Sequence, residues 1–318
     1  MSGPSLLLVS LVYLALLFVV AALGDRGRFR LSPAMQARAY GLTLAVYCSS
    51  WTFYGAVGSA AREFWRFLPI YLGPMLLLLF APVILQRLID VGRQRGVTSI
   101  ADMIATRFGR SAGLAALISL IALIASLPYL ALQLRAVAMS IDALSGGGQR
   151  PDWWMDSALP VAAILAIFAI GFGTREVDAR EHHRGLMLAV ALESLVKLLA
   201  FVLIGLWAAT RLFGIPSVEW SGTLDFGLPD GFFAHTVLSF VALFCLPRQF
   251  QVAVVECTDS QHFRSARWGL LGYLAIITVL VLPITMLGAV VLPAGVRPDL
   301  WMLALPLQSG DSLLALVR

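Results

Sequence analysis

The sequence predicts an all-α integral membrane protein with about eight transmembrane helices. Of its 318 residues, 59% are hydrophobic and only 13% are charged, whereas soluble domains are about half apolar and about a quarter charged. Apolar runs of transmembrane length recur along the chain, and nearly all basic residues lie between them. A soluble chain of this size could not bury so many apolar residues in its own core, so the composition excludes most classes of soluble enzyme.

Eight runs are long enough to cross the hydrocarbon layer, which takes about 20 mostly apolar residues. The first is followed by arginines rather than by a small-residue cleavage site, so we interpret it as a span and not as a signal peptide. The fourth is 33 residues long and contains Pro128, which predicts one tilted or kinked helix because two spans and a turn would not fit. The eight runs cover residues 5–23, 40–61, 67–86, 111–143, 157–173, 186–210, 232–257 and 268–292.

Basic residues in the short connections predict the orientation of the bundle. Of the 23 basic residues, fourteen lie in the connections after the first, third, fifth and seventh runs, and six lie in the other connections and at the end of the chain. Cytoplasmic loops carry an excess of Lys and Arg, so the N-terminus is expected outside. This placement accounts for the net charge of +5. The expected partner is therefore a lipid bilayer and not a nucleic acid.

The inner connection 87–110 predicts a structure of its own. Ser99 with Asp102 forms a plausible capping box, apolar residues follow at helical spacing, and Gly109 is suited to end a helix. We interpret the segment as a short amphipathic helix on the inner membrane surface. A solvated basic loop is the alternative.

Two runs are interrupted by polar residues. In the second run the interruption is YCSSWTFYG at 47–55, whose hydroxyl groups can bond their own backbone and help to unwind the helix. Small residues also mediate close helix packing, so this signal is ambiguous alone. In the seventh run Pro247 removes a backbone donor beside Arg248. A plain proline kink with Arg248 reaching the inner interface is the alternative to a broken helix.

Together, the two interruptions predict a site. No other break of this kind is obvious in the bundle, and paired broken helices are how secondary transporters hold a solute or an ion. In the fourth run Tyr129 and Gln133 share a helix face and could line a central cavity or make packing hydrogen bonds.

Glu193 and Lys197 are spaced i, i+4 within the sixth run. This order favours a local ion pair facing a neighbouring helix, with a proton relay as the alternative. The chain contains no nucleophile-and-base arrangement, phosphate-binding loop or carboxylate cluster, and its three cysteines are not in a metal-binding spacing. We therefore expect no enzyme activity in this chain and no resident metal or organic cofactor.

Several of these segments resemble the solute:sodium symporter family. Within that family, the chain looks most like the transporter-like membrane module at the N-terminus of CbrA-type sensor histidine kinases. The segments that carry the resemblance are YCSSWTFYGAVGSAARE (47–63), FLPIYLGP (67–74), TSIADMIATRFGR (98–110), LPYLALQLRAVAMS (127–140), ESLVKLLAF (193–201) and FCLPRQFQVAVVEC (244–257).

The resemblance implies a single domain over residues 1–318 with a LeuT-type core of two inverted five-helix repeats. Residues 5–23 would be one extra span before the core, and residues 40–213 the first repeat. Residues 232–292 would begin the second repeat, with 293–318 as an outer segment. The second repeat is then truncated in this sequence.

The resemblance also implies a site between the two broken helices. Although the residues alone predict no cofactor, the family resemblance implies a possible sodium ion. The backbone carbonyls of Ala45 and Cys48 would hold it, together with hydroxyl groups from a later helix that this sequence does not contain. The first broken helix has no carboxylate, so weak sodium coupling, no coupling and proton coupling all stay open. The implied solute-binding residues are Ser49, Ser50, Trp51, Tyr129, Gln133, Arg248 and Gln249.

The resemblance predicts a multi-pass protein of the inner (plasma) membrane that carries out sodium- or proton-coupled symport. The solute would be small and polar, such as a histidine-like amino acid. The alternative is a solute-sensing input domain of a two-component sensor histidine kinase, with PAS and kinase domains beyond residue 318. Both functions need the same cavity, so these residues do not separate them.

Overall fold

A computed structural model gives the structure of residues 3–27, 32–145, 184–214, 226–257, 259–293 and 295–309, together with residues 159, 162, 163 and 166. Within these residues every regular element is a helix. Among the described residues, four helices are long and apolar enough to cross a membrane, or up to six if each of two bent pairs counts as one span. The prediction of an all-α membrane protein is confirmed, whereas the number eight stays a prediction. The predicted span 157–173 lies outside the described residues.

The four long helices match the first, fourth, sixth and eighth predicted runs. They are α1 (Gly3–Asp25), α8 (Ala112–Ser145), α10 (Arg184–Phe213) and α13 (Ser260–Val291). The fourth run is one continuous helix of 34 residues with Pro128 inside it, as predicted.

Helix α13 begins earlier than the predicted residue 268, because the side chain of Asp259 caps it by accepting from the amide of Gln261 at 2.9 Å. Arg264 and Arg267 therefore lie on the helix and not in a loop.

The second run is broken as the polar motif predicts. It consists of α2 (Pro33–Leu44), the 3-10 segment η1 (Ala45–Tyr47), α3 (Ser50–Phe53) and α4 (Gly55–Arg62). Cys48 and Ser49 have extended backbone conformations between η1 and α3. The Ser49 hydroxyl accepts from the amide of Trp51 at 3.3 Å, so a residue of the motif itself starts the next helix.

The third run is also broken, which the sequence analysis did not expect. Helix α5 (Leu68–Phe80) and helix α6 (Pro82–Arg95) meet at an angle of 76°. Pro82 has no amide hydrogen and clashes with the preceding turn, so it begins a new helix instead of continuing the old one. The run 67–86 therefore contains a sharp bend that was not predicted, and the structure has a third break besides the two polar ones. The connection expected from residue 87 is helical as far as Arg95.

The seventh run is broken at the predicted proline. Helix α11 (Phe232–Cys245) ends at Leu246, which is extended, and α12 (Pro247–Phe250) leads into a π-helical segment, η5 (Gln251–Val255). The two parts differ in direction by 50°. A broken helix, rather than a slight kink, is confirmed.

The short helix α7 (Ile100–Arg107) lies within the connection 87–110, where a helix was predicted. The Ser99 hydroxyl accepts from the amide of Asp102 at 3.1 Å, and the Asp102 carboxylate accepts from the amide of Thr98 at 3.1 Å. Gly109, with φ 69°, follows the helix. The solvated-loop alternative is therefore wrong for this segment.

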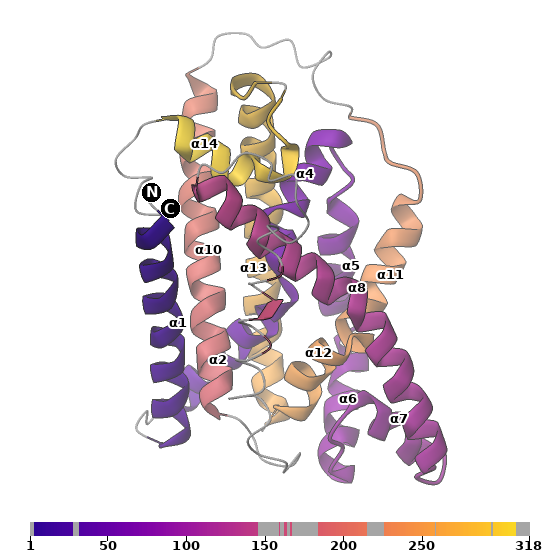
Figure 1. Cartoon of the computed structure of the whole chain (residues 1–318). Helices are drawn as coiled ribbons and strands as arrows, with labels where there is room; N and C mark the ends of the chain where they lie inside the picture. The colour runs from indigo at the N-terminus through magenta and orange to yellow at the C-terminus, as the bar shows by residue number, and fades with distance from the viewer. Residues whose placement is uncertain are drawn as a thin grey trace.

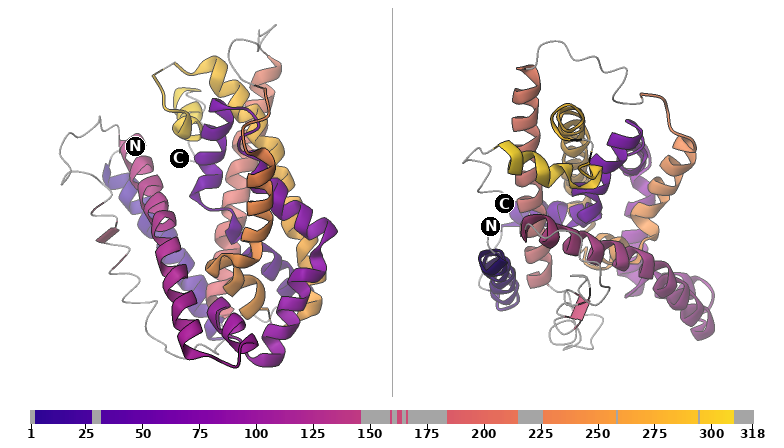
Figure 2. Two further views of the ribbon diagram at one scale, coloured as in Figure 1. Left: turned by 90° about the vertical axis from the view of Figure 1, so that its right-hand side faces the viewer. Right: turned by 45° about the horizontal axis from the view of Figure 1, so that its top comes forward.

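Helix α13 lies at the centre of the packing and contacts α2, α4, α5 and α10. Helix α5 packs closely on α11 at Gly73, where an added Cβ would lie 2.4 Å from the backbone nitrogen of Phe240. Helix α8 crosses one face of the bundle from α7 to the side of α14 (Trp301–Ser309), as Figures 1 and 2 show. The 3-10 segment η6 (Pro298–Leu300) lies against α4. Helix α8 contacts α3, so α8 and η6 both lie against the second half of the broken second run.

Candidate functional site

The break of the second run at Cys48 and Ser49 (the first break) and the break of the seventh run at Leu246 (the second break) are adjacent and joined by hydrogen bonds. The side-chain amide of Gln249 donates to the carbonyl of Leu44 at 3.0 Å, and the hydroxyl of Tyr40 donates to the carbonyl of Ala253 at 2.7 Å. Gln249 is fully buried. Segments about 200 residues apart in the chain are therefore tied together at the breaks, on the α2 side of the first one.

Arg248 turns toward α8. Its guanidinium donates to the hydroxyl of Tyr129 and lies 4.6 Å from the centre of that ring. A guanidinium over an aromatic face combines charge attraction with packing. Arg248 and Tyr129 therefore partner each other, which joins α12 to α8.

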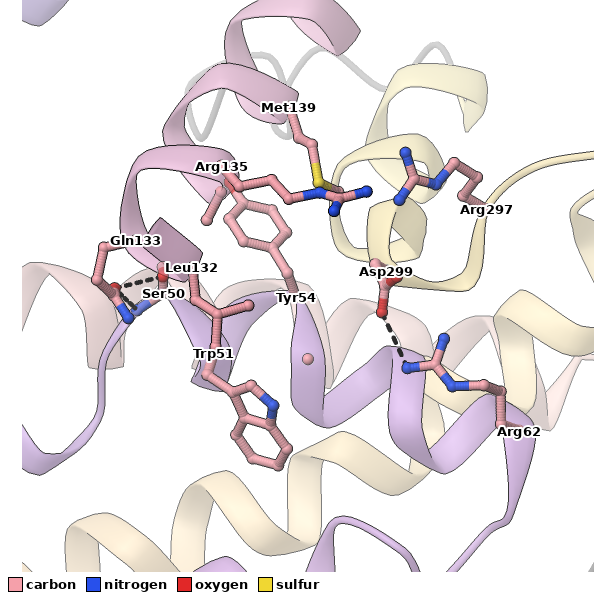
Figure 3. A pocket seen from close by; sticks show the side chains of 12 residues that line it. Ser50, Trp51, Tyr54, Arg62, Leu132, Gln133, Arg135, Met139, Arg297 and Asp299 are labelled. Atoms are coloured by element: carbon pink, nitrogen blue, oxygen red, sulfur yellow. Dashed lines mark hydrogen bonds and ion pairs between the residues drawn. The ribbon is translucent and has the colours of Figure 1, made fainter. Parts of the chain in front are cut away.

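A pocket of about 350 Å³ lies on the other side of the first break. Ser50 donates through its amide (3.3 Å) and its hydroxyl to the side-chain oxygen of Gln133, which ties the start of α3 to α8. Figure 3 shows this pair beside the indole of Trp51. The lining residues come from α3, α4, α8 and the segment around η6: Ser50, Trp51, Tyr54, Gly55, Arg62, Leu132, Gln133, Arg135, Ala136, Met139, Arg297 and Asp299.

Three arginines and one aspartate give this pocket a positive charge. Arg62 forms an ion pair with Asp299 at 3.3 Å. The other two guanidinium groups, of Arg135 and Arg297, face each other across the pocket in Figure 3. Neither of them has a carboxylate partner among the residues that the structure describes. Among the described residues that line the pocket, two positive charges are thus left without an acidic partner.

The predicted solute-binding residues divide into two groups. Ser50, Trp51 and Gln133 line the pocket. The other four support the breaks: Ser49 caps α3, Tyr129 and Arg248 contact each other, and Gln249 binds the Leu44 carbonyl.

The sequence analysis missed several pocket residues. Tyr54, whose hydroxyl lies 2.6 Å from that of Ser140, is one helical turn from Ser50, a spacing that could have placed it on the same face. The pairing of Arg62 with Asp299 joins residues 237 positions apart and has no local signal.

The predicted ion pair within the sixth run is confirmed. Lys197 Nζ lies 3.1 Å from Glu193 Oε1 on α10. The same ammonium also donates to the carbonyl of Cys48 at 3.0 Å, which the sequence analysis did not foresee. The intramembrane lysine therefore lies at the first break.

The carbonyls that the family resemblance assigns to a sodium ion already have donors. The carbonyl of Ala45 accepts from the amide of Cys48 at 2.9 Å, and the carbonyl of Cys48 accepts from Lys197. A second cation about 4 Å from the ammonium would be repelled by roughly 4 kcal/mol at an effective dielectric constant of about 20. As they stand, these residues do not fit a sodium ion.

The long apolar helices and the bent pairs define the class of this protein as an all-α membrane protein. No protein-family model, no curated protein and no solved structure matches the chain. The resemblance to solute:sodium symporters and the LeuT-type arrangement therefore stay predictions that rest on the sequence motifs.

Proposed function

We propose that this protein is a membrane-embedded module that binds a small polar solute with a carboxylate group, such as an amino acid, and moves it across the plasma membrane. The observation that carries the proposal is the pocket beside the first break, in which Arg135 and Arg297 face each other and neither forms an ion pair with a carboxylate of the described residues. Like charges across a cavity repel each other unless an anion lies between them.

The chemistry of the pocket supports an amino acid. A guanidinium binds a carboxylate with two parallel hydrogen bonds, which makes arginine well suited to this group. Ser50, Tyr54 and Gln133 offer neutral polar atoms for an ammonium or a polar side chain, while Trp51 and Met139 offer apolar contacts. The volume of about 350 Å³ is in the range of small-molecule sites, which is about 300–1,000 Å³.

The arrangement of the breaks supports transport. Secondary transporters hold their solute where helices are discontinuous, and two broken runs meet beside this pocket. The pocket lies on the α4 side of the first break, which the arginine distribution assigns to the outside. On the α2 side, the bonds from Tyr40 and Gln249 hold the two runs together. This asymmetry is what an outward-facing state of an alternating-access transporter requires.

The test is equilibrium binding of radiolabelled amino acids to the purified full chain in lipid nanodiscs. Arg135→Gln removes one of the two unpaired charges, so it should weaken binding by at least about tenfold, the value of one charge-assisted hydrogen bond. Arg107→Gln is the matched control, because Arg107 lies on α7, away from the pocket. Equal affinities for these two variants would remove Arg135 from the site.

Uptake into proteoliposomes separates transport from sensing. A transporter accumulates the bound amino acid inside the vesicles, whereas a receptor binds it without uptake. Binding without uptake would favour the alternative function, an input domain that reports solute occupancy to a sensor kinase.

A further inference from the structure

A lysine lies at the break of the second run. Lys197 is the only lysine of the chain, and its side chain is 19% exposed. Its ammonium contacts two oxygens, the carbonyl of Cys48 at 3.0 Å and the carboxylate of Glu193 at 3.1 Å. A charge within an apolar helix is costly unless it is paired, so these two oxygens fix where the ammonium lies.

The carbonyl of Cys48 has lost its helical partner. Cys48 ends the 3-10 segment in an extended conformation. The amides that follow the break bond instead to Ser49: Trp51 donates to its hydroxyl, and Thr52 donates to its carbonyl at 3.0 Å. A buried carbonyl without a donor is strongly unfavourable. Lys197 therefore supplies the hydrogen bond that the break removes.

Contacts of α10 with two neighbouring helices fix the position of Lys197. The hydroxyl of Tyr273 on α13 donates to the carbonyl of Ser194 at 3.0 Å, three residues before Lys197. Helix α10 also packs along α2, the helix that leads into the break. The ammonium thus projects from a helix that is anchored on both sides.

We propose that the ammonium of Lys197 is a built-in cation that holds the break of the second run, at the carbonyl where the family resemblance implies a sodium ion. The break then keeps its conformation without sodium, and solute binding does not depend on sodium. This inference rests on the proposed function, because a sodium-independent site matters only if the protein binds a solute. Its test uses no solute, so the two proposals can fail independently of each other.

The test follows the rate at which N-ethylmaleimide modifies each cysteine of the full chain, measured by peptide mass spectrometry in NaCl and in KCl of equal ionic strength. Cys48 is buried and reports opening of the break, while the exposed Cys245 controls for the reagent. Wild-type Cys48 should be equally protected in both salts. Lys197→Met should raise its rate by at least about tenfold, because a charged hydrogen bond is lost. Arg211→Met, which removes a charge from the outer end of α10, should not.

Two outcomes would overturn the proposal. In the wild type, sodium could slow the modification of Cys48 by more than about threefold relative to potassium, which would identify a bound ion. Alternatively, Lys197→Met could leave Cys48 as protected as in the wild type.

Cys257, which is also buried, shows whether Lys197→Met still folds. If it does not fold, Glu193→Gln replaces it, since this variant keeps the ammonium and should leave Cys48 protected in both salts. Rapid modification of Cys48 in Glu193→Gln would contradict the proposal.

Discussion

The hydrogen bonds between the two breaks can be tested by a double-mutant cycle. Tyr40→Phe removes one hydroxyl from a ring that is 7% exposed, and with it the 2.7 Å bond to the carbonyl of Ala253. Gln249→Leu removes the 3.0 Å bond to the carbonyl of Leu44. It also removes the side-chain oxygen of Gln249, which is buried and has no hydrogen-bond partner among the described residues, so part of its cost is offset.

The expected losses of unfolding free energy differ because the two variants leave different numbers of buried polar atoms unpaired. Tyr40→Phe should lower the free energy of unfolding by about 1–2 kcal/mol, because a buried carbonyl loses its donor. Gln249→Leu should lower it by less than about 1 kcal/mol. Because both bonds brace the same two segments, loss of one loosens the other. The double variant should then cost about 0.5–1 kcal/mol less than the sum of the single variants.

The assay is reversible unfolding of the purified protein by sodium dodecyl sulfate in mixed micelles, followed by circular dichroism. Tyr54→Phe is the matched control, because its hydroxyl contacts Ser140 on α8 and not the second break. Its effect should add to that of Gln249→Leu. The reasoning is refuted if the Tyr40 pair is as additive as the Tyr54 pair, or if Tyr40→Phe costs nothing.

Two close helix contacts give the remaining predictions. In Gly58→Ala the added Cβ would lie 1.9 Å from a carboxylate oxygen of Asp299. Asp299 must move, so this variant should lose the ion pair with Arg62 and about 1–3 kcal/mol of stability, measured in the same unfolding assay. In Gly73→Ala the Cβ would meet backbone that cannot turn aside, so α5 and α11 should separate at a cost of more than about 2 kcal/mol. Gly269→Ala, with nothing within 4 Å, should be neutral or slightly stabilising, and a similar result for Gly73→Ala would contradict the packing described.

The sequence predicted those parts of the fold that local chemistry determines. The capping box at Ser99, the break at Cys48 and Ser49, and the continuous helix through Pro128 each follow from residues within a few positions of one another. The bend at Pro82 had a local signal as well, but a proline inside an apolar run was not interpreted as the start of a new helix. Asp259 was likewise not recognised as the cap of α13.

The candidate site was predictable only in part, because its pairings are long-range. The family resemblance implied Ser50, Trp51 and Gln133, and helix periodicity placed Gln133 on a face that could line a cavity or make packing hydrogen bonds; all three line the pocket. The facing pair of Arg135 and Arg297 depends on how α8 packs beside η6, and no local pattern specifies that packing. The contact of Lys197 with the Cys48 carbonyl likewise spans 149 residues. Long-range contacts of these charged side chains can be recognised only when the tertiary structure is known.

The central claim is that the pocket recognises a carboxylate. The most direct measurement compares the binding of histidine and of histamine, which lacks only the carboxylate, to the wild-type full chain in nanodiscs. We expect histidine to bind at least about tenfold more tightly, since the two unpaired arginines contact the group that histamine lacks. If histamine binds as tightly as histidine or more tightly, the account of this pocket is wrong.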